Sequence, residues 1–149
     1  MKIDLNNSIA FRINKTANKL NVAFNQILSK YNIALEQRVT LEIIKKEKKI
    51  TSTEIASILS KDKTTISRTL RVLERKDLIQ RSEALEDRRI NFIELTPKGM
   101  KTIKDSEKDI NDFRNNLISN LSKKEVSTLF NLLEKTTKNF ESCTDDKGK

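Results

Sequence analysis

Glycine and proline are almost absent from this chain, and their scarcity constrains its fold more than any other feature. Among 149 residues there are two glycines and one proline, and Gly148 lies next to the C-terminus. Because these residue types interrupt helices, their absence favours long helices joined by short polar turns. The sequence therefore predicts a mainly α fold, with residues 1–149 expected as a single domain.

The first part of the chain predicts two amphipathic helices. Apolar side chains recur every three or four residues and indicate one long helix: Ile9, Ile13, Ala17, Leu20, Phe24, Ile27 and Tyr31. A second helix is expected from Ala34 to about Lys46, with three apolar residues buried: Val39, Leu41 and Ile44. Lysines between positions 45 and 49 surround its C-terminal end, where the helix dipole favours positive charge.

The middle of the chain predicts two short helices joined by a tight turn. Thr51 and Glu54 have the spacing of a capping box, in which a hydroxyl and a carboxylate each bond a free backbone amide. Ser60-Lys61-Asp62 interrupts the pattern, and Asp62 is expected to cap the next helix. That helix turns Ile66, Leu70 and Leu73 inward. It turns a polar, basic set outward: Thr64, Thr65, Ser67, Arg68 and Arg71.

After Asp77 the helical period stops, and a small β-hairpin is expected from residues 78–81 and 90–95 around a charged loop. Thr96 followed by Pro97 is typical of a helix start. The helix that begins there carries apolar residues as far as Leu121: Met100, Ile103, Ile110, Phe113, Leu117 and Leu121. Ser122 and Glu125 indicate a last capped helix with one apolar face, and residues 142–149 are expected to be a frayed tail. That face comprises Val126, Leu129, Leu133 and Phe140.

Missing residue types exclude several classes of function. The chain has no histidine and a single cysteine, Cys143, so it can form neither an intramolecular disulfide nor the usual Cys/His zinc site nor a Ser-His-Asp triad. We expect no metal and no cofactor, and we rank an enzyme last. No apolar run approaches the ~20 residues that span a bilayer, so a cytoplasmic protein is expected. Cys143, in the expected tail, is interpreted as an incidental thiol.

Charge and the helix pair together favour DNA. A net charge of +9 suits nucleic acid, an anionic membrane or an acidic protein, and does not choose among them. The major groove accepts a helix whose exposed face carries short hydroxyls and arginines. A flexible arginine on a hairpin tip can also enter the minor groove. The expected contacts on the helix are Lys63, Thr64, Thr65, Ser67, Arg68 and Arg71.

The order of these elements resembles the multiple-antibiotic-resistance regulator (MarR) family. The segment KDKTTISRTLRVLERKDLI resembles the family's recognition helix, and EDRRINFIELTPKG resembles its wing and the start of the next helix. The resemblance implies a winged helix-turn-helix lobe over residues 34–96, with dimerisation helices at 1–33 and 97–141. It also implies that Arg89 reaches the minor groove beside Arg88, and that Asp87 orients basic side chains near the wing.

The same resemblance implies a homodimeric repressor on a pseudo-palindromic double-stranded operator, with recognition helices in major grooves about 34 Å apart. It implies release by a small-molecule effector, for which Phe11, Phe24, Tyr31 and Phe113 are candidate lining residues, although core packing accounts for most of them. The chain departs from the family at Ser60 and Asp77, where the family usually has glycine and left-handed backbone is expected.

A basic helical adaptor is the alternative interpretation. The same exposed face and terminal helices would then serve protein contacts. Salt separates the two, because DNA binding through several phosphates weakens steeply with ionic strength and apolar helix packing does not.

Overall fold

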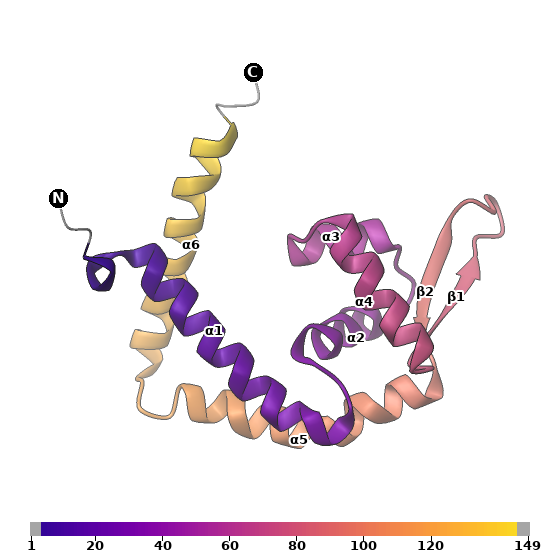
Figure 1. Ribbon diagram of the computed structural model, residues 1–149, viewed down its shortest axis with the longest axis horizontal. Helices are drawn as coiled ribbons and strands as arrows, with labels where there is room; N and C mark the ends of the chain where they lie inside the picture. Colours follow the sequence, from indigo (N-terminus) through magenta and orange to yellow (C-terminus); the bar gives the residue numbers. More distant parts are fainter. Residues whose placement is uncertain (1–3, 146–149) are drawn as a thin grey trace. The chain divides into compact units, whose positions relative to one another are not determined.

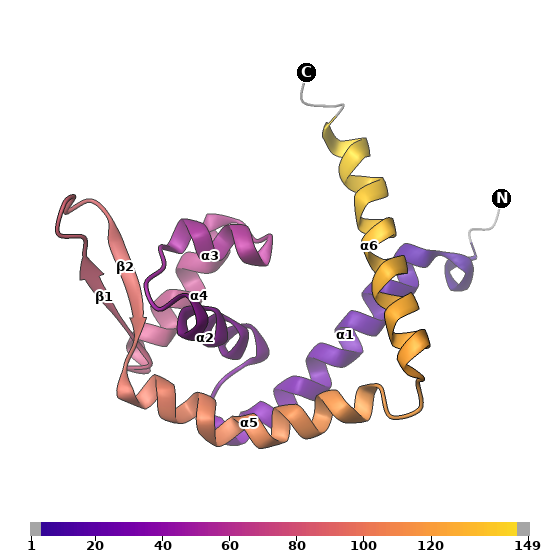
Figure 2. The ribbon, with the colours of Figure 1, turned by 180° about the vertical axis from the view of Figure 1, so that it is seen from behind.

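The computed structural model describes residues 4–145, which form helices and one two-stranded antiparallel sheet (Figures 1 and 2). Residues up to Ile110 make one unit and residues from Asn111 onward make a second, so the helix α5 belongs to both. The mainly helical fold with a small hairpin confirms the prediction. In chain order the elements are η1 (Leu5–Asn7), α1 (Ile9–Leu28), η2 (Ser29–Tyr31), α2 (Leu35–Glu47), α3 (Ser52–Leu59), α4 (Lys63–Arg75), β1 (Ile79–Glu83), β2 (Asn91–Leu95), α5 (Pro97–Leu117) and α6 (Lys123–Asp145).

The first unit holds a core of aliphatic side chains, most of which come from α2, α3, α4 and the hairpin. Figure 1 shows the helices α2, α3 and α4 close together, with the hairpin beside them. Ile93 of β2 is fully buried, and its amide donates to the carbonyl of Ile50, which extends the hairpin by one bridge. The buried apolar residues are Leu28, Ile33, Leu41, Ile44, Ile50, Ile55, Ala56, Ile66, Leu70, Leu73, Leu78, Ile79, Ile93, Ile103 and Ile110. This core fixes α4 against the sheet.

The buried face of α2 differs from the expected one. Val39 is only half-buried, whereas Gln37, Arg38 and Thr40 are buried together with Leu41 and Ile44. Burial of these polar groups is possible because each has a hydrogen-bond partner: Ser106 for Arg38, Lys76 for Gln37 and the Glu36 carbonyl for Thr40. The periodicity of apolar residues alone does not predict a buried helix face that includes polar residues.

Two helix ends differ from their predicted positions. Helix α5 ends at Leu117, so Leu121 belongs to a turn instead, in which the amide of Leu121 donates to the carbonyl of Ile118 at 3.0 Å. Helix α6 continues to Asp145, so the expected tail of residues 142–149 is wrong in its first part. Ser142 and Thr144 stay helical, and their hydroxyls donate to backbone carbonyls three residues earlier. Residues 146–149 lie outside the described part of the chain.

The second unit consists of the end of α5, the turn and α6. Ser122 and Glu125 form the predicted capping pair, with the Glu125 carboxylate accepting from the Ser122 amide at 2.8 Å. None of the α6 residues whose side chains are described is buried, although several are large and apolar. In residues 4–145, no helix is long and apolar enough to cross a membrane.

Candidate nucleic-acid interface

A tight turn joins α3 to α4. The predicted capping box begins α3: the amide of Thr51 donates to the Glu54 carboxylate at 2.8 Å, and the Thr51 hydroxyl accepts from the Glu54 amide at 3.3 Å. Ser60 ends the helix with φ 51° and ψ 43°, the left-handed conformation, and the amide of Lys61 turns back to the carbonyl of Ala56. The expectation of left-handed backbone at Ser60 is therefore confirmed.

Asp62 starts α4 as predicted. Its carboxylate accepts from the Thr65 amide at 2.7 Å and from the Thr65 hydroxyl at 3.0 Å. These two hydrogen bonds, the backbone one foremost, hold the pKa of Asp62 below its ordinary value. The carboxylate thus stays charged at the positive end of α4 and fixes where the helix begins.

The outward face of α4 is polar and positively charged. Ile66, Leu70 and Leu73 are buried as predicted, and Thr69 is buried beside them with its hydroxyl bonded to the carbonyl of Thr65. Thr65 itself is half-buried, so its hydroxyl serves the helix cap. The other predicted contact residues on this helix are exposed: Lys63, Thr64, Ser67, Arg68 and Arg71. The structure therefore brings five of the six together on one accessible face.

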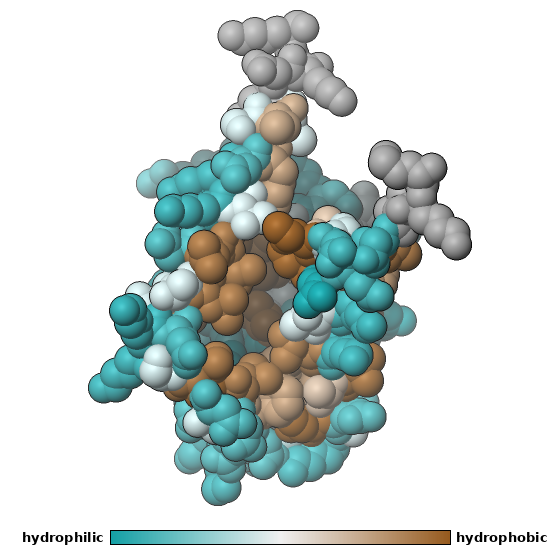
Figure 3. Space-filling model, turned by 90° about the vertical axis from the view of Figure 1, so that its left-hand side faces the viewer, coloured by the Kyte–Doolittle hydropathy of each residue, from teal (hydrophilic) through white to brown (hydrophobic). Residues whose placement is uncertain are grey.

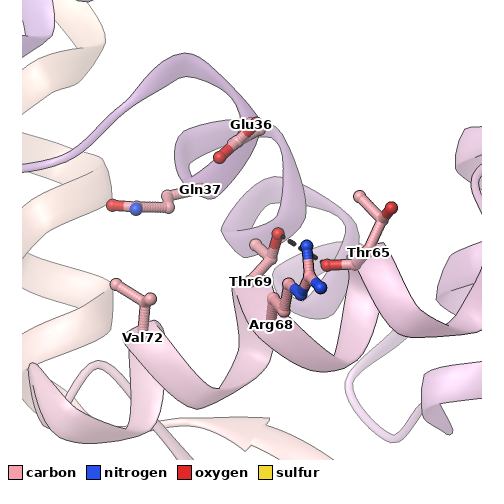
Figure 4. A pocket seen from close by; sticks show the side chains of 6 residues that line it. All are labelled: Glu36, Gln37, Thr65, Arg68, Thr69 and Val72. Carbon is pink, nitrogen blue, oxygen red and sulfur yellow. Dashed lines mark hydrogen bonds between the residues drawn. The ribbon is translucent and has the colours of Figure 1, made fainter.

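A small cavity of about 180 Å³ lies between the start of α2 and α4 (Figure 4). Glu36 and Gln37 come from α2, and Thr65, Arg68, Thr69 and Val72 come from α4. The guanidinium of Arg68 lies at the side of this cavity in Figure 4. A molecule bound in this cavity would contact Arg68 on the exposed face of α4.

The wing is the hairpin of β1 and β2, with Arg81 opposite Ile93 and Glu83 opposite Asn91. Beyond the paired residues, the amide of Ala84 donates to the carbonyl of Ile90 at 2.9 Å, which closes the tip. The predicted strands agree with these to within two residues. The tip therefore projects as a defined loop, and the predicted contact residues Asp87, Arg88 and Arg89 all lie on it.

Asp87 and Arg89 are joined at the tip. The Arg89 guanidinium donates through Nε at 3.2 Å and Nη2 at 3.3 Å to the two carboxylate oxygens, and the Arg89 amide donates at 3.0 Å. The hydrogen bond from the Arg89 amide has the largest effect on the pKa of Asp87, followed by those from the guanidinium, and both lower it. The Arg89 side chain nevertheless remains 91% exposed. Arg88 is exposed next to it.

Three residues of the LTPKG motif fasten the wing to the end of α4, whereas the sequence predicts only a helix start at Thr96 and Pro97. The Thr96 hydroxyl donates to the carbonyl of Asp77 at 2.6 Å and accepts from the Gly99 amide at 3.0 Å. Lys98 donates to the carbonyl of Lys76 at 2.9 Å. A Cβ on Gly99 would lie 2.1 Å from the carbonyl oxygen of Leu78, so only glycine fits there. We call Thr96, Lys98 and Gly99 the clasp.

Asp77 adopts the left-handed conformation with φ 59°, as expected at the second position where the family usually has glycine. Aspartate tolerates this conformation better than most residues. Next to it, Lys76 donates to the carbonyl of Asn32 at 2.6 Å and to Gln37 at 3.1 Å. The C-terminal end of α4 is therefore fastened both to the wing and to the start of α2.

A buried arginine joins α2 to the first half of α5, and sequence reasoning missed it. Arg38 is 2% exposed, donates to the Ser106 hydroxyl at 2.8 Å, and lies 2.8 Å from the Glu42 carboxylate. A further bond reaches the carbonyl of Ile103. A charge on the predicted helix of residues 34–46 gave no signal by itself, because its partner Ser106 lies 68 residues away.

A capped helix, a tight turn, an exposed second helix and a two-stranded wing define a winged helix-turn-helix protein. A sequence profile described as the MarR family matches residues 33–90. The HTH-type transcriptional regulator YdgJ of Bacillus subtilis (strain 168) is 26% identical over 102 residues, which cover 68% of this chain and 62% of that protein. The chain thus spans less than two thirds of that curated relative.

Solved structures extend the similarity to most of the chain. A MepR-DNA complex of S. aureus has a TM-score of 0.82 at 26% identity and covers 89% of this chain and 96% of its own. A mutant MarR of E. coli complexed with operator DNA has a TM-score of 0.82 at 28% identity and covers 91% and 99%. Residues 33–90 therefore match the MarR family of winged helix-turn-helix transcription regulators, and solved structures of this family share the fold over most of the chain.

Proposed function

We propose that this chain is a sequence-specific double-stranded DNA-binding protein that acts as a homodimeric repressor. One observation carries the proposal: the exposed basic face of α4 and the exposed Arg89 of the wing belong to one unit, in which the clasp joins the two elements. A major groove accepts α4, and the adjoining minor groove accepts the wing. The complexes of MepR and MarR with DNA support this arrangement.

We assign different roles to the predicted residues. Arg68 and Arg71 have the reach and the donors to read guanine edges, and Thr64 and Ser67 are short enough to allow close approach. Lys63, in the first turn of α4, contacts phosphate. Arg89 enters the minor groove while Asp87 holds its guanidinium, and Arg88 contacts the backbone beside it. Thr65 acts through the cap of α4.

A homodimer would cover apolar side chains that the chain leaves exposed. Figure 3 shows such side chains in brown at the surface. Ile9 and Val22 of α1 are 66% and 59% exposed, and Phe130 and Phe140 of α6 are 69% and 56% exposed. Several large apolar side chains exposed to this extent are typical of a protein contact surface. A second copy of the chain is the occupant that the family fold supports.

We further propose that a small molecule releases the DNA. The cavity beside Arg68 is one place where a bound anion would compete with DNA. A second cavity of about 330 Å³ is lined by α1, by the start of α2, and by Leu59 and Lys61. Neither of these two cavities is lined by Phe11, Phe24, Tyr31 or Phe113. Phe24 and Tyr31 pack against the core instead, in keeping with their simpler interpretation.

Selection of bound fragments from genomic DNA tests the proposal. We expect enrichment of a pseudo-palindromic site, salt-sensitive binding, and a particle of twice the 17.2 kDa chain mass on size-exclusion chromatography. A monomer that enriches no sequence would refute the proposal. An inverted repeat that reduces transcription of the adjoining gene in vitro would establish repression.

A further inference from the structure

Four exposed lysines lie together where α2 ends, outside the DNA contacts proposed for α4 and the wing. They are Lys45, Lys46, Lys48 and Lys49, called here the lysine ridge. Only Glu47 interrupts the run. The helix dipole accounts for Lys45 and Lys46, which are in the last turn of α2. Lys48 is the C-cap of the helix and Lys49 follows it, so the dipole also favours their charge, but it does not occupy the four ammonium groups.

The ridge is attached to the wing. The Lys49 ammonium lies 6.0 Å from the centroid of the Phe92 ring, and Phe92 belongs to β2. The carbonyl of the next residue, Ile50, accepts a hydrogen bond from the amide of Ile93 at 2.8 Å. Because β2 pairs with β1 through its other edge, the ridge adjoins the wing on the side away from β1. A wing seated in a groove would therefore carry these lysines towards the DNA.

The backbone of the ridge is strained at Lys48. Lys48 has φ 63° and ψ −50°, and the amide of Lys49 donates to the carbonyl of Glu47 at 2.7 Å. This is the classic γ-turn, which is rare and strained for any residue with a side chain, whereas glycine adopts positive φ freely. A lysine at such a position is consistent with a role for its charge.

Acidic neighbours neutralise only part of the ridge. Glu47 and Glu54 share with Lys49 the lining of a shallow cavity, and the Glu54 carboxylate is already bonded to Thr51. None of the four lysines has an ion pair within the described residues 4–145, and all four are exposed. The ridge thus offers several exposed positive charges beside the wing.

We propose that the lysine ridge binds phosphates of the duplex next to the groove that the wing enters, and so adds sequence-independent contacts to the DNA interface. The inference rests on the proposed DNA-binding function and extends it to a surface outside the helix-turn-helix. Lysine suits this role because it meets phosphate as a point charge. Such contacts strengthen binding to every sequence and do not select among them.

The test compares Lys48→Gln/Lys49→Gln with Lys123→Gln/Lys124→Gln, a pair of adjacent exposed lysines that start α6. Both variants lose two charges. Affinities for the selected operator and for a scrambled duplex are measured at several salt concentrations. If each ridge lysine contacts one phosphate, the slope of log K against log salt falls by about 1.8, with affinity lower by on the order of tenfold at low salt.

The expected result is the same loss on both duplexes for the ridge variant, no loss for the α6 variant, and recovery in Lys48→Arg/Lys49→Arg with an unchanged melting temperature. An unchanged salt slope in the ridge variant, or an equal fall in both Gln variants, would overturn the inference. A wild-type protein that shows no salt-sensitive binding to either duplex would instead refute the DNA-binding function itself, and the ridge with it.

Discussion

Gly99→Ala tests the clasp most directly, because alanine ordinarily favours a helix. In the first turn of α5 the added Cβ would lie 2.1 Å from the Leu78 oxygen, 3.1 Å from the Leu78 carbonyl carbon and 3.4 Å from Leu95 Cδ2. A carbon–oxygen contact of ordinary length is about 3.2 Å, so the helix start and Leu78 must separate by about 1 Å. The obstacle is backbone, which no side-chain rotation moves aside.

Such a shift disturbs the hydrogen bonds around it. The Thr96 amide donates to the Leu78 oxygen at 3.1 Å, and the Thr96 hydroxyl donates to the Asp77 oxygen at 2.6 Å. Each bond contributes about 1 kcal/mol, and strained packing adds about 1 to 3 kcal/mol. Against this, the helix-propensity gain is at most about 1 kcal/mol. We expect Gly99→Ala to lower the free energy of unfolding by about 2 to 4 kcal/mol.

Urea denaturation at equal protein concentration measures the change. Lys101→Ala, at an exposed position two residues farther along α5, is the control and should alter stability by less than about 0.5 kcal/mol. The Gly99→Ala variant should also lose affinity for DNA, because the clasp holds the wing to the end of α4. A Gly99→Ala protein as stable as wild type would show that the close approach to Leu78 is not a constraint.

Four further substitutions follow from the same contacts. Ser60→Gly should raise the free energy of unfolding by about 1 kcal/mol in urea melts, because glycine adopts φ 51° without strain; a loss of stability would contradict this. Asp62→Ala should lower it by about 1 kcal/mol at pH 7. Because the folded pKa of Asp62 is lowered, its contribution is present above the ordinary value of 3.8 and is lost as the pH falls through the folded pKa, so the difference between the two proteins should shrink in acid. Arg89→Ala should weaken operator binding by about 1 to 3 kcal/mol in titrations while the dimer persists, and wild-type affinity would refute its groove contact. Arg38→Ala should lower the free energy of unfolding, measured in the same urea melts, by about 3 kcal/mol, since it removes the buried partner of Ser106 and Glu42.

Sequence reasoning was strongest where a structural signal is local. Thr51 with Glu54, and Asp62 with the amide three residues later, satisfy free amides within a single turn, so their spacing alone predicts the helix starts. Helix ends were less predictable. Helix α5 ends at Leu117, just after Asn115 and Asn116, which favour turns but do not mark one end position. Helix α6 continues past its expected end because no glycine or proline stops it before Gly148.

The clasp and Arg38 were not predictable because their partners are distant along the chain. Thr96 meets Asp77 across 19 residues, and Arg38 meets Ser106 across 68. One signal was available: Gly99 is the only glycine before the C-terminal end of the chain. An isolated glycine within a helical pattern commonly marks close packing, which is the role that the Leu78 carbonyl gives it.

The two contact elements of the interface are ordered before any DNA arrives. Asp62 fixes the start of α4, and the clasp with Lys76 fixes its end, so the helix needs no rearrangement to enter a groove. At the wing, Asp87 holds Arg89 through Nε and Nη2, which leaves the remaining guanidinium donors for the proposed minor-groove contact. Ordering a long side chain on binding costs about 0.5 to 1.5 kcal/mol, and Asp87 removes part of that cost in advance. An Asp87→Ala variant should therefore bind DNA less tightly than wild type even though it removes a negative charge from the interface.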